Sequence, residues 1–200
     1  MSMSKFELLD ALLQNNNGFL KSSEAVAAGI SRPYLREYVQ DRGLERVAHG
    51  LYMSQDAWED GMYVIQTRYP QAVFSHETAL YLLNLAEREP LKCSITLKSG
   101  TNASGLTRQG VRVFKIKESL FWDGITEARS LAGHALRVYN PELTICDLIR
   151  SRRSIEIQDI QSAFREYVRR ADKNIPLLMR YAKALVVERL VTQYLQVLLP

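Results

Sequence analysis

The segment that decides the fold is Ser22–Tyr52, SSEAVAAGISRPYLREYVQDRGLERVAHGLY. Ser22 or Ser23 is expected to cap a short helix, with Glu24 in the first turn, where a negative charge suits the helix dipole. Gly29 is expected to end this helix, because glycine readily adopts the left-handed conformation that closes a last turn. Ile30 can then pack back against the helix.

A second helix is expected to follow at once. Ser31 is a suitable N-cap, and Pro33 falls in the first turn, where its missing N–H group costs nothing. Leu35, Tyr38 and Val39 recur with helical spacing and are expected to face the core. The opposite side carries side chains that hydrogen-bond to phosphates or base edges, namely Arg32, Tyr34, Arg36 and Gln40.

A short hairpin is expected directly after the second helix. Gly43 ends the helix, and residues 44–48 and 51–54 form two strands joined at His49-Gly50. Helix, turn, helix and hairpin follow one another in this order in a winged helix-turn-helix, a DNA-binding fold. We therefore expect Arg46 and His49 to touch the DNA backbone. The rest of the predicted DNA-binding set is Lys21, Ser22, Ser31, Arg32, Tyr34, Arg36 and Gln40.

A purely structural interpretation of the helix pair stands beside this one. Short helices joined at a glycine occur in many α-rich domains, and residues 1–53 carry six Lys/Arg against six Asp/Glu. Net charge therefore does not distinguish the two interpretations. The placement of the polar side chains and the hairpin favour DNA binding.

The composition is that of a globular protein. Of the 200 residues, 46% are hydrophobic, which suffices for packed cores, and the formal charge is +4. No apolar run of ~18 residues could span a bilayer, and the N-terminal residues lack the blocks of a signal peptide. A cytoplasmic location is expected. The basic excess falls on residues 54–200, with 20 Lys/Arg against 16 Asp/Glu, and it fits a phosphate-bearing partner.

The predicted fold class is α+β and mostly helical, with two domains. Residues 1–54 form the winged helix-turn-helix, which begins with a helix over 4–15. Residues 55–200 form a larger α/β domain with a small sheet. Its expected elements are helices from Asp56 to Tyr69 and from His76 to Leu85, strands at 92–98, 111–116 and 135–139, a polar loop over 99–110, and a helix after Asn140-Pro141.

The chain is expected to be wholly helical from Ile155 and to end in an apolar run that reaches Leu199. The same region is rich in cations. Such charges usually form a solvated helix face. The functional alternative is a second basic surface for DNA flanking the operator or for an acidic or RNA-bound partner. The residues of this candidate surface are Arg150, Arg152, Arg153, Arg165, Arg169, Arg170, Lys173, Arg180 and Lys183.

The sequence offers no convincing catalytic or metal-binding set. Cys93 and Cys146 lack the spacing of a zinc site or a disulfide scaffold. In Ser75-His76-Glu77 the serine and glutamate are better explained as a helix cap and a first-turn charge. Nucleotide-binding and zinc-protease motifs do not occur, and the expected strands lack the acids of a metal-dependent nuclease. No catalytic residue, metal or cofactor is predicted.

Several motifs span most of the chain. They are Ala28-Gly29-Ile30-Ser31 with Leu35, Gly43-Leu44-Glu45-Arg46-Val47, Gly50-Leu51-Tyr52, Val73-Phe74-Ser75-His76-Glu77-Thr78-Ala79-Leu80 with Leu85, and Val138-Tyr139-Asn140-Pro141-Glu142-Leu143-Thr144 with Asp147-Leu148-Ile149. In their order and spacing, these motifs resemble those of the AbiEi-type antitoxins of abortive-infection, type IV toxin-antitoxin systems.

The resemblance implies a repressor of its own operon. Its winged domain would bind inverted repeats in double-stranded DNA, with two or more copies binding cooperatively. The C-terminal domain would counteract a nucleotidyltransferase toxin without a stable complex. Two other interpretations stay open. The chain could be a protein-binding adaptor that uses the winged domain and the apolar C-terminal helix, or, less favoured, an enzyme that acts on nucleic acid.

Overall fold

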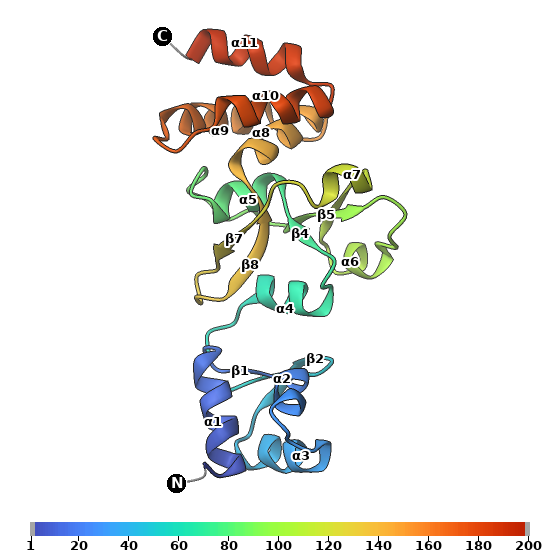
Figure 1. Cartoon of the computed structure of the whole chain (residues 1–200), viewed down its shortest axis with the longest axis vertical. Helices are drawn as coiled ribbons and strands as arrows, with labels where there is room; N and C mark the ends of the chain where they lie inside the picture. The colour runs from blue at the N-terminus through green and yellow to red at the C-terminus, as the bar shows by residue number, and fades with distance from the viewer. Residues whose placement is uncertain (1–2, 199–200) are drawn as a thin grey trace. The chain divides into compact units, whose positions relative to one another are not determined.

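The computed structural model describes residues 3–198 and is mixed α/β, as the sequence predicts (Figure 1). Contacts divide the chain into two compact units. The first contains the residues up to Pro70 together with Arg129–Leu136, and the second contains Gln71–Ala128 and the residues from Arg137 onward. By its contacts the first unit therefore extends beyond the winged segment.

The first unit contains a helix-turn-helix and an antiparallel three-stranded sheet. Its sheet has the order β1-β3-β2, and the β2–β3 hairpin is the wing. The elements are α1 (Lys5–Asn15), β1 (Phe19–Lys21), α2 (Ser22–Ala27), α3 (Arg32–Asp41), β2 (Glu45–Ala48), β3 (Leu51–Met53) and α4 (Gly61–Arg68). The predicted succession of helix, turn, helix and hairpin is confirmed.

The turn between α2 and α3 has the expected glycine geometry. Gly29 has φ +84°, and the Ile30 N–H donates to the carbonyl oxygen of Ala25 at 3.0 Å. Ile30 is buried with Leu35 and Tyr38 in the core of this unit. The local sequence therefore closes α2 and seats α3 on the same core.

Two expectations for the first unit are wrong. Lys21, rather than Ser22 or Ser23, is the N-cap residue of α2, because Lys21 belongs to an additional strand, β1, that pairs with β3. The helix expected from Asp56 begins only at Gly61. Its cap is Asp60, whose Oδ1 accepts from the Tyr63 N–H at 3.0 Å.

The second unit is built on a five-stranded sheet of order β6-β5-β4-β8-β7. β4 runs antiparallel to β5 and parallel to β8, and β5 and β6 are parallel. The strands are β4 (Val73–Phe74), β5 (Ser94–Lys98), β6 (Arg112–Ile116), β7 (Ile125–Arg129) and β8 (Ala135–Tyr139). The three predicted strands correspond to β5, β6 and β8, whereas β4 and β7 were not predicted.

Helices make up the rest of the second unit. The buried helix α8 is central, since every residue from Glu142 to Ile149 is buried, and the helices after it pack around it. The helices are α5 (His76–Leu82), α6 (Ser104–Arg108), α7 (Glu118–Phe121), α8 (Pro141–Arg150), α9 (Ile157–Arg169), α10 (Ile175–Ala184) and α11 (Glu188–Leu198).

Two expectations for this unit are corrected. The loop predicted over 99–110 contains α6, which Asn102 supports by accepting from the Ser104 N–H at 2.9 Å. The helix predicted to reach Leu85 ends at Leu82, because Asn84 has φ +58° and so breaks the helical backbone. Leu199, at the end of the expected apolar run, lies outside the described residues.

Candidate nucleic-acid interface

One face of the helix α3 is buried in the core of the first unit, and the opposite face is exposed. Leu35 and Tyr38 are buried in the core of the first unit. Ser31 is the N-cap residue and is exposed, and its side chain makes no capping hydrogen bond. Pro33 occupies the first turn, as expected.

The outer face of α3 carries three side chains of the predicted DNA-binding set. Arg32, Arg36 and Gln40 are exposed. Within residues 3–198, none of the three side chains has a hydrogen-bond or ion-pair partner. Their spacing of four residues places them along one line of the helix. Their donors and acceptors are therefore available to a ligand.

Tyr34 lies apart from this line. Its ring is half-buried and meets Phe6 of α1 edge to face, with centroids 5.5 Å apart. The Lys5 ammonium lies 5.3 Å from the centre of the Tyr34 ring. The structure thus uses the ring of Tyr34 to join α3 to α1.

In the wing, the two residues of the predicted set contact each other. Arg46 Nη2 lies 2.9 Å from His49 Nδ1, and Arg46 Nε donates to the carbonyl oxygen of Ala48 at 3.4 Å. Both side chains are exposed. A break in the pairing register between Arg46 and Ala48 accompanies these contacts. The wing tip therefore presents one ordered cationic group.

Lys21 and Ser22 lie where β1 meets α2, and both are half-buried. Lys21 pairs with Glu24 at 3.1 Å, and its ammonium lies 5.1 Å from the centre of the Tyr63 ring. The Ser22 N–H donates to the carbonyl oxygen of Gly50 at 2.8 Å, which ties the start of α2 to the wing. Both residues therefore lie beside the wing and are joined to it, Lys21 by strand pairing with Leu51 and Ser22 by the hydrogen bond to Gly50.

Sequence reasoning missed the residue that anchors α3. Asp10 of α1 accepts a hydrogen bond from the Tyr38 hydroxyl at 2.7 Å and binds the Arg42 guanidinium through both oxygens. Asp10 is separated from these partners by about thirty residues, so no local pattern indicates the pairing. Only its helical spacing from Phe6 on α1 signals which face it occupies.

Most cations of the candidate second basic surface have partners within the second unit. Five of the nine pair with acids: Arg150 with Asp147, Arg169 with Glu166, Arg170 with Asp172, Arg180 with Asp123 and Lys183 with Glu188. Arg152 and Lys173 donate to the carbonyl oxygens of Ile149 and Arg170. Arg153 and Arg165 are exposed and, within the described part of the chain, have no side-chain partner.

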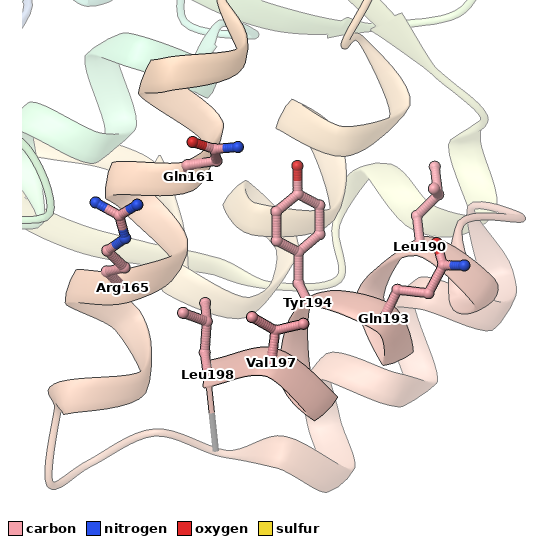
Figure 2. A pocket seen from close by; sticks show the side chains of 7 residues that line it. All are labelled: Gln161, Arg165, Leu190, Gln193, Tyr194, Val197 and Leu198. Carbon is pink, nitrogen blue, oxygen red and sulfur yellow. The ribbon is translucent and has the colours of Figure 1, made fainter. Parts of the chain in front are cut away.

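The hollows of the second unit include a groove and a larger recess. A groove of ≈ 410 Å³ runs between α9 and α11, where Tyr194 stacks on Phe164 and Val197 is exposed (Figure 2). Arg165 and Gln161 line its α9 side, as Figure 2 shows. The larger hollow, of ≈ 1030 Å³, is lined by more acids than bases. Its acids are Glu77, Glu87, Glu89, Glu156, Asp159 and Glu166, and its bases are Arg88, Lys92 and Arg112.

His76 has the surroundings of a structural residue. Its ring is buried and stacked on Phe114, with Nδ1 3.0 Å from the Ser75 hydroxyl and Nε2 2.9 Å from the Ser151 hydroxyl. Burial lowers the pKa of His76 well below its usual value, and the nearby Arg150 and Arg112 lower it further. The ring is therefore neutral and enclosed. Among residues 3–198, no group of His, Cys, Asp and Glu side chains is arranged to hold a metal ion.

No helix in the described part of the chain has the length and apolar character needed to cross a membrane. A comparison with curated proteins gave no match. The fold is similar to the crystal structure of the RV2827C protein from Mycobacterium tuberculosis, with a TM-score of 0.57 and 13% sequence identity. The similarity covers 91% of this chain and 72% of that chain. At this level of identity it concerns the fold alone.

A family model described as "Transcriptional regulator, AbiEi antitoxin" matches residues 7–55. These residues contain α1, the helix-turn-helix and the wing. The match thus falls on the elements that carry Arg32, Arg36 and Gln40. Over this segment the resemblance predicted from the sequence is confirmed.

Proposed function

We propose that this protein is a cytoplasmic repressor that binds inverted repeats in its own promoter. The observation that carries the proposal is the exposed line of Arg32, Arg36 and Gln40, whose side chains have no intramolecular partner within residues 3–198. The family match over residues 7–55 supports the same role. In this proposal α3 enters the major groove, and Arg46 and His49 of the wing lie at the phosphate backbone.

The other residues of the predicted DNA-binding set have supporting roles in this proposal. The exposed Ser31 hydroxyl lies at the N-terminus of α3, where a phosphate oxygen is well placed to accept from it. Lys21 and Ser22 lie next to the wing and can bind the same strand. Tyr34 contributes its hydroxyl group, because its ring packs on Phe6. Arg153 and Arg165 are the most available cations for flanking DNA.

The test is a titration of labelled promoter DNA followed by fluorescence anisotropy. Arg32→Ala combined with Arg36→Ala should lose at least ~10-fold in affinity, since each good bidentate base contact is worth roughly 1–3 kcal/mol. The matched control is Arg88→Ala combined with Arg189→Ala, which removes two exposed cations of the second unit. Equal affinity of the two double variants would reject α3 as the DNA-binding helix.

Binding to inverted repeats brings at least two copies to one operator. We therefore propose cooperative binding, which a Hill coefficient above one on the full operator and near one on a single half-site would support. A one-to-one isotherm on the full operator would contradict it.

We further propose that the C-terminal domain predicted over residues 55–200 counteracts a nucleotidyltransferase toxin encoded in the same operon, without a stable complex. The family match over residues 7–55 and the resemblance of the motifs around Val73–Leu80 and Val138–Ile149 support this role. The test is co-expression: residues 55–200 alone should relieve the growth arrest caused by the neighbouring gene product. Persistent arrest, with the fragment shown to be soluble and folded, would oppose it.

A protein-binding adaptor is the second candidate function. The groove between α9 and α11 favours it, because Val197 is 82% exposed at its edge. If this candidate is correct, the protein leaves promoter DNA unbound and co-purifies with its neighbouring gene product, and Val197→Asp abolishes the co-purification.

A further inference from the structure

The three free side chains of α3 form an ordered set rather than a general cationic patch. Arg32, Arg36 and Gln40 stand at positions i, i+4 and i+8. Each step of four residues advances about 6 Å along the helix and turns it by about 40°. The three side chains therefore follow one another in sequence along a groove that the helix enters.

Each of these side chains has a preferred base edge. The arginine guanidinium donates two parallel hydrogen bonds to O6 and N7 of guanine. The glutamine amide accepts a hydrogen bond from the N6 amino group of adenine and donates one to N7. Arg42, the next cation along the chain, is already bound to Asp10 at 2.7 Å. Its engagement leaves Arg32 and Arg36 as the arginines of this helix that can read bases.

The charge of α3 also favours base reading over general attraction to phosphates. Arg32 and Arg36 are balanced within the helix by the exposed Glu37 and Asp41. A helix without net charge gains little from sequence-independent binding to the backbone, which depends on neutralised phosphates. Its contribution must come from hydrogen bonds to base edges, and the two carboxylates keep phosphates away from their flank of the helix.

The spacing relates the side chains to base pairs. In zinc fingers, whose helices also enter the major groove, helix positions three to four residues apart contact successive bases. We infer that each operator half-site presents guanine, guanine and adenine at three successive base pairs, read by Arg32, Arg36 and Gln40 respectively. This inference rests on the proposed function, since it specifies the DNA that the same helix binds.

The experiment removes the N7 acceptor from bases without changing their Watson–Crick pairing. Promoter duplexes carry 7-deazaguanine in place of every guanine within the bound half-site, and affinity is measured by anisotropy. The unaltered protein should lose at least ~5-fold in affinity, the lower end of the value of a bidentate contact. The double variant Arg32→Ala with Arg36→Ala should lose no more than twofold in affinity when guanine is replaced by 7-deazaguanine. It already lacks the guanidinium groups that donate to N7.

A second arm tests the adenine. 7-Deazaadenine should weaken binding of the unaltered protein but not of Gln40→Ala. The Arg88→Ala and Arg189→Ala control should keep the full sensitivity to both modified bases, and circular dichroism checks that all variants are folded.

The outcomes separate the two proposals. If the unmodified promoter is not bound, the proposed function fails, and the inference fails with it. If the promoter is bound but 7-deazaguanine has no effect, or if it weakens the arginine variant as much as the unaltered protein, the inference alone is overturned.

Discussion

The Tyr38 hydroxyl donates a hydrogen bond to Oδ1 of Asp10 at 2.7 Å and so links α3 to α1. The Arg42 guanidinium binds the same carboxylate, through Nε at 3.1 Å and Nη2 at 2.7 Å. Burial raises the pKa of the Tyr38 phenol, and the bond to Asp10 raises it further, so the hydroxyl keeps its proton and remains a donor. One carboxylate thus fixes Tyr38 of α3 and Arg42, the C-cap residue of this helix, and with them which face of the helix points outward.

Tyr38→Phe removes this hydrogen bond and keeps the packing of the ring. We expect it to lower the free energy of unfolding by about 1 kcal/mol, the usual net value of such a bond. Urea denaturation followed by circular dichroism measures the loss. Tyr52→Phe is the control, because the Tyr52 hydroxyl has no hydrogen bond within residues 3–198, and it should change stability by less than ~0.5 kcal/mol. Equal losses in the two variants would contradict the role of Asp10.

Two glycines with almost the same backbone conformation should respond differently to alanine. Gly18 has φ +83°, and an added Cβ would lie 2.5 Å from Cβ of Ala57 and 2.7 Å from the Ser54 hydroxyl oxygen. Gly29 has φ +84° and open space around it. Gly29→Ala should lower the free energy of unfolding by about 1–2 kcal/mol, because alanine is strained in the left-handed backbone conformation. Gly18→Ala should lower it clearly more, because the added Cβ also clashes with its neighbours. Thermal denaturation of the two variants decides, and a smaller loss at Gly18 would show that the steric argument is wrong.

The features that the sequence predicts well are those encoded by neighbouring residues. The turn between α2 and α3 follows from the local backbone preferences of Gly29, Ile30 and Ser31. Helical spacing likewise predicts that Arg32 and Arg36 are exposed, as they are in the structure. The strand β4 escapes prediction because it has only two residues and is defined by its pairing with β5 and β8. β7, with the sequence ITEAR, lacks the apolar alternation of a half-buried strand.

Contacts between distant residues explain the remaining differences at the site. Tyr34 borders the exposed face of its helix, and only the position of Phe6 decides that its ring is half-buried. Likewise, the pairing of Arg180 with Asp123 joins residues 57 positions apart. The sequence shows an excess of cations in the last third, but it cannot show which of them the fold neutralises.

The wing should bind DNA without regard to sequence. Arg46 is held by His49 and the Ala48 carbonyl oxygen, so little side-chain entropy is left to lose on binding a phosphate. Arg46→Ala should weaken binding to the operator and to unrelated DNA by the same factor. It should also reduce the slope of log affinity against log salt concentration by about 0.9. Anisotropy titrations at four salt concentrations measure both effects, and a loss confined to operator DNA would instead assign Arg46 to base reading.

The second unit contains a buried acid that makes stability depend on pH. Asp147 of α8 is fully buried, and its Oδ1 lies 2.7 Å from Nη2 of Arg150. Burial raises the pKa of Asp147 from 3.8 to about 6, although Arg150 acts in the opposite direction. The folded state therefore keeps a proton that the unfolded chain releases between pH ~4 and pH ~6. The contribution of Asp147 to stability is fully present below this range, falls as the pH rises through it, and is constant above it.

Asp147→Asn should remove this dependence, because a carboxamide does not titrate. As the pH rises from 4 to 7, the unaltered protein should lose up to about 3 kcal/mol of unfolding free energy that the variant keeps. Urea denaturation at half-unit pH steps measures the difference, with the exposed Asp159→Asn as the control. Arg150→Met gives an independent check: without the guanidinium the pKa of Asp147 rises further, so the decline in stability should extend to higher pH. Parallel pH profiles for the unaltered protein, Asp147→Asn and Asp159→Asn would mean that Asp147 is ionised throughout this range, and that the guanidinium of Arg150 outweighs the cost of burying the carboxylate.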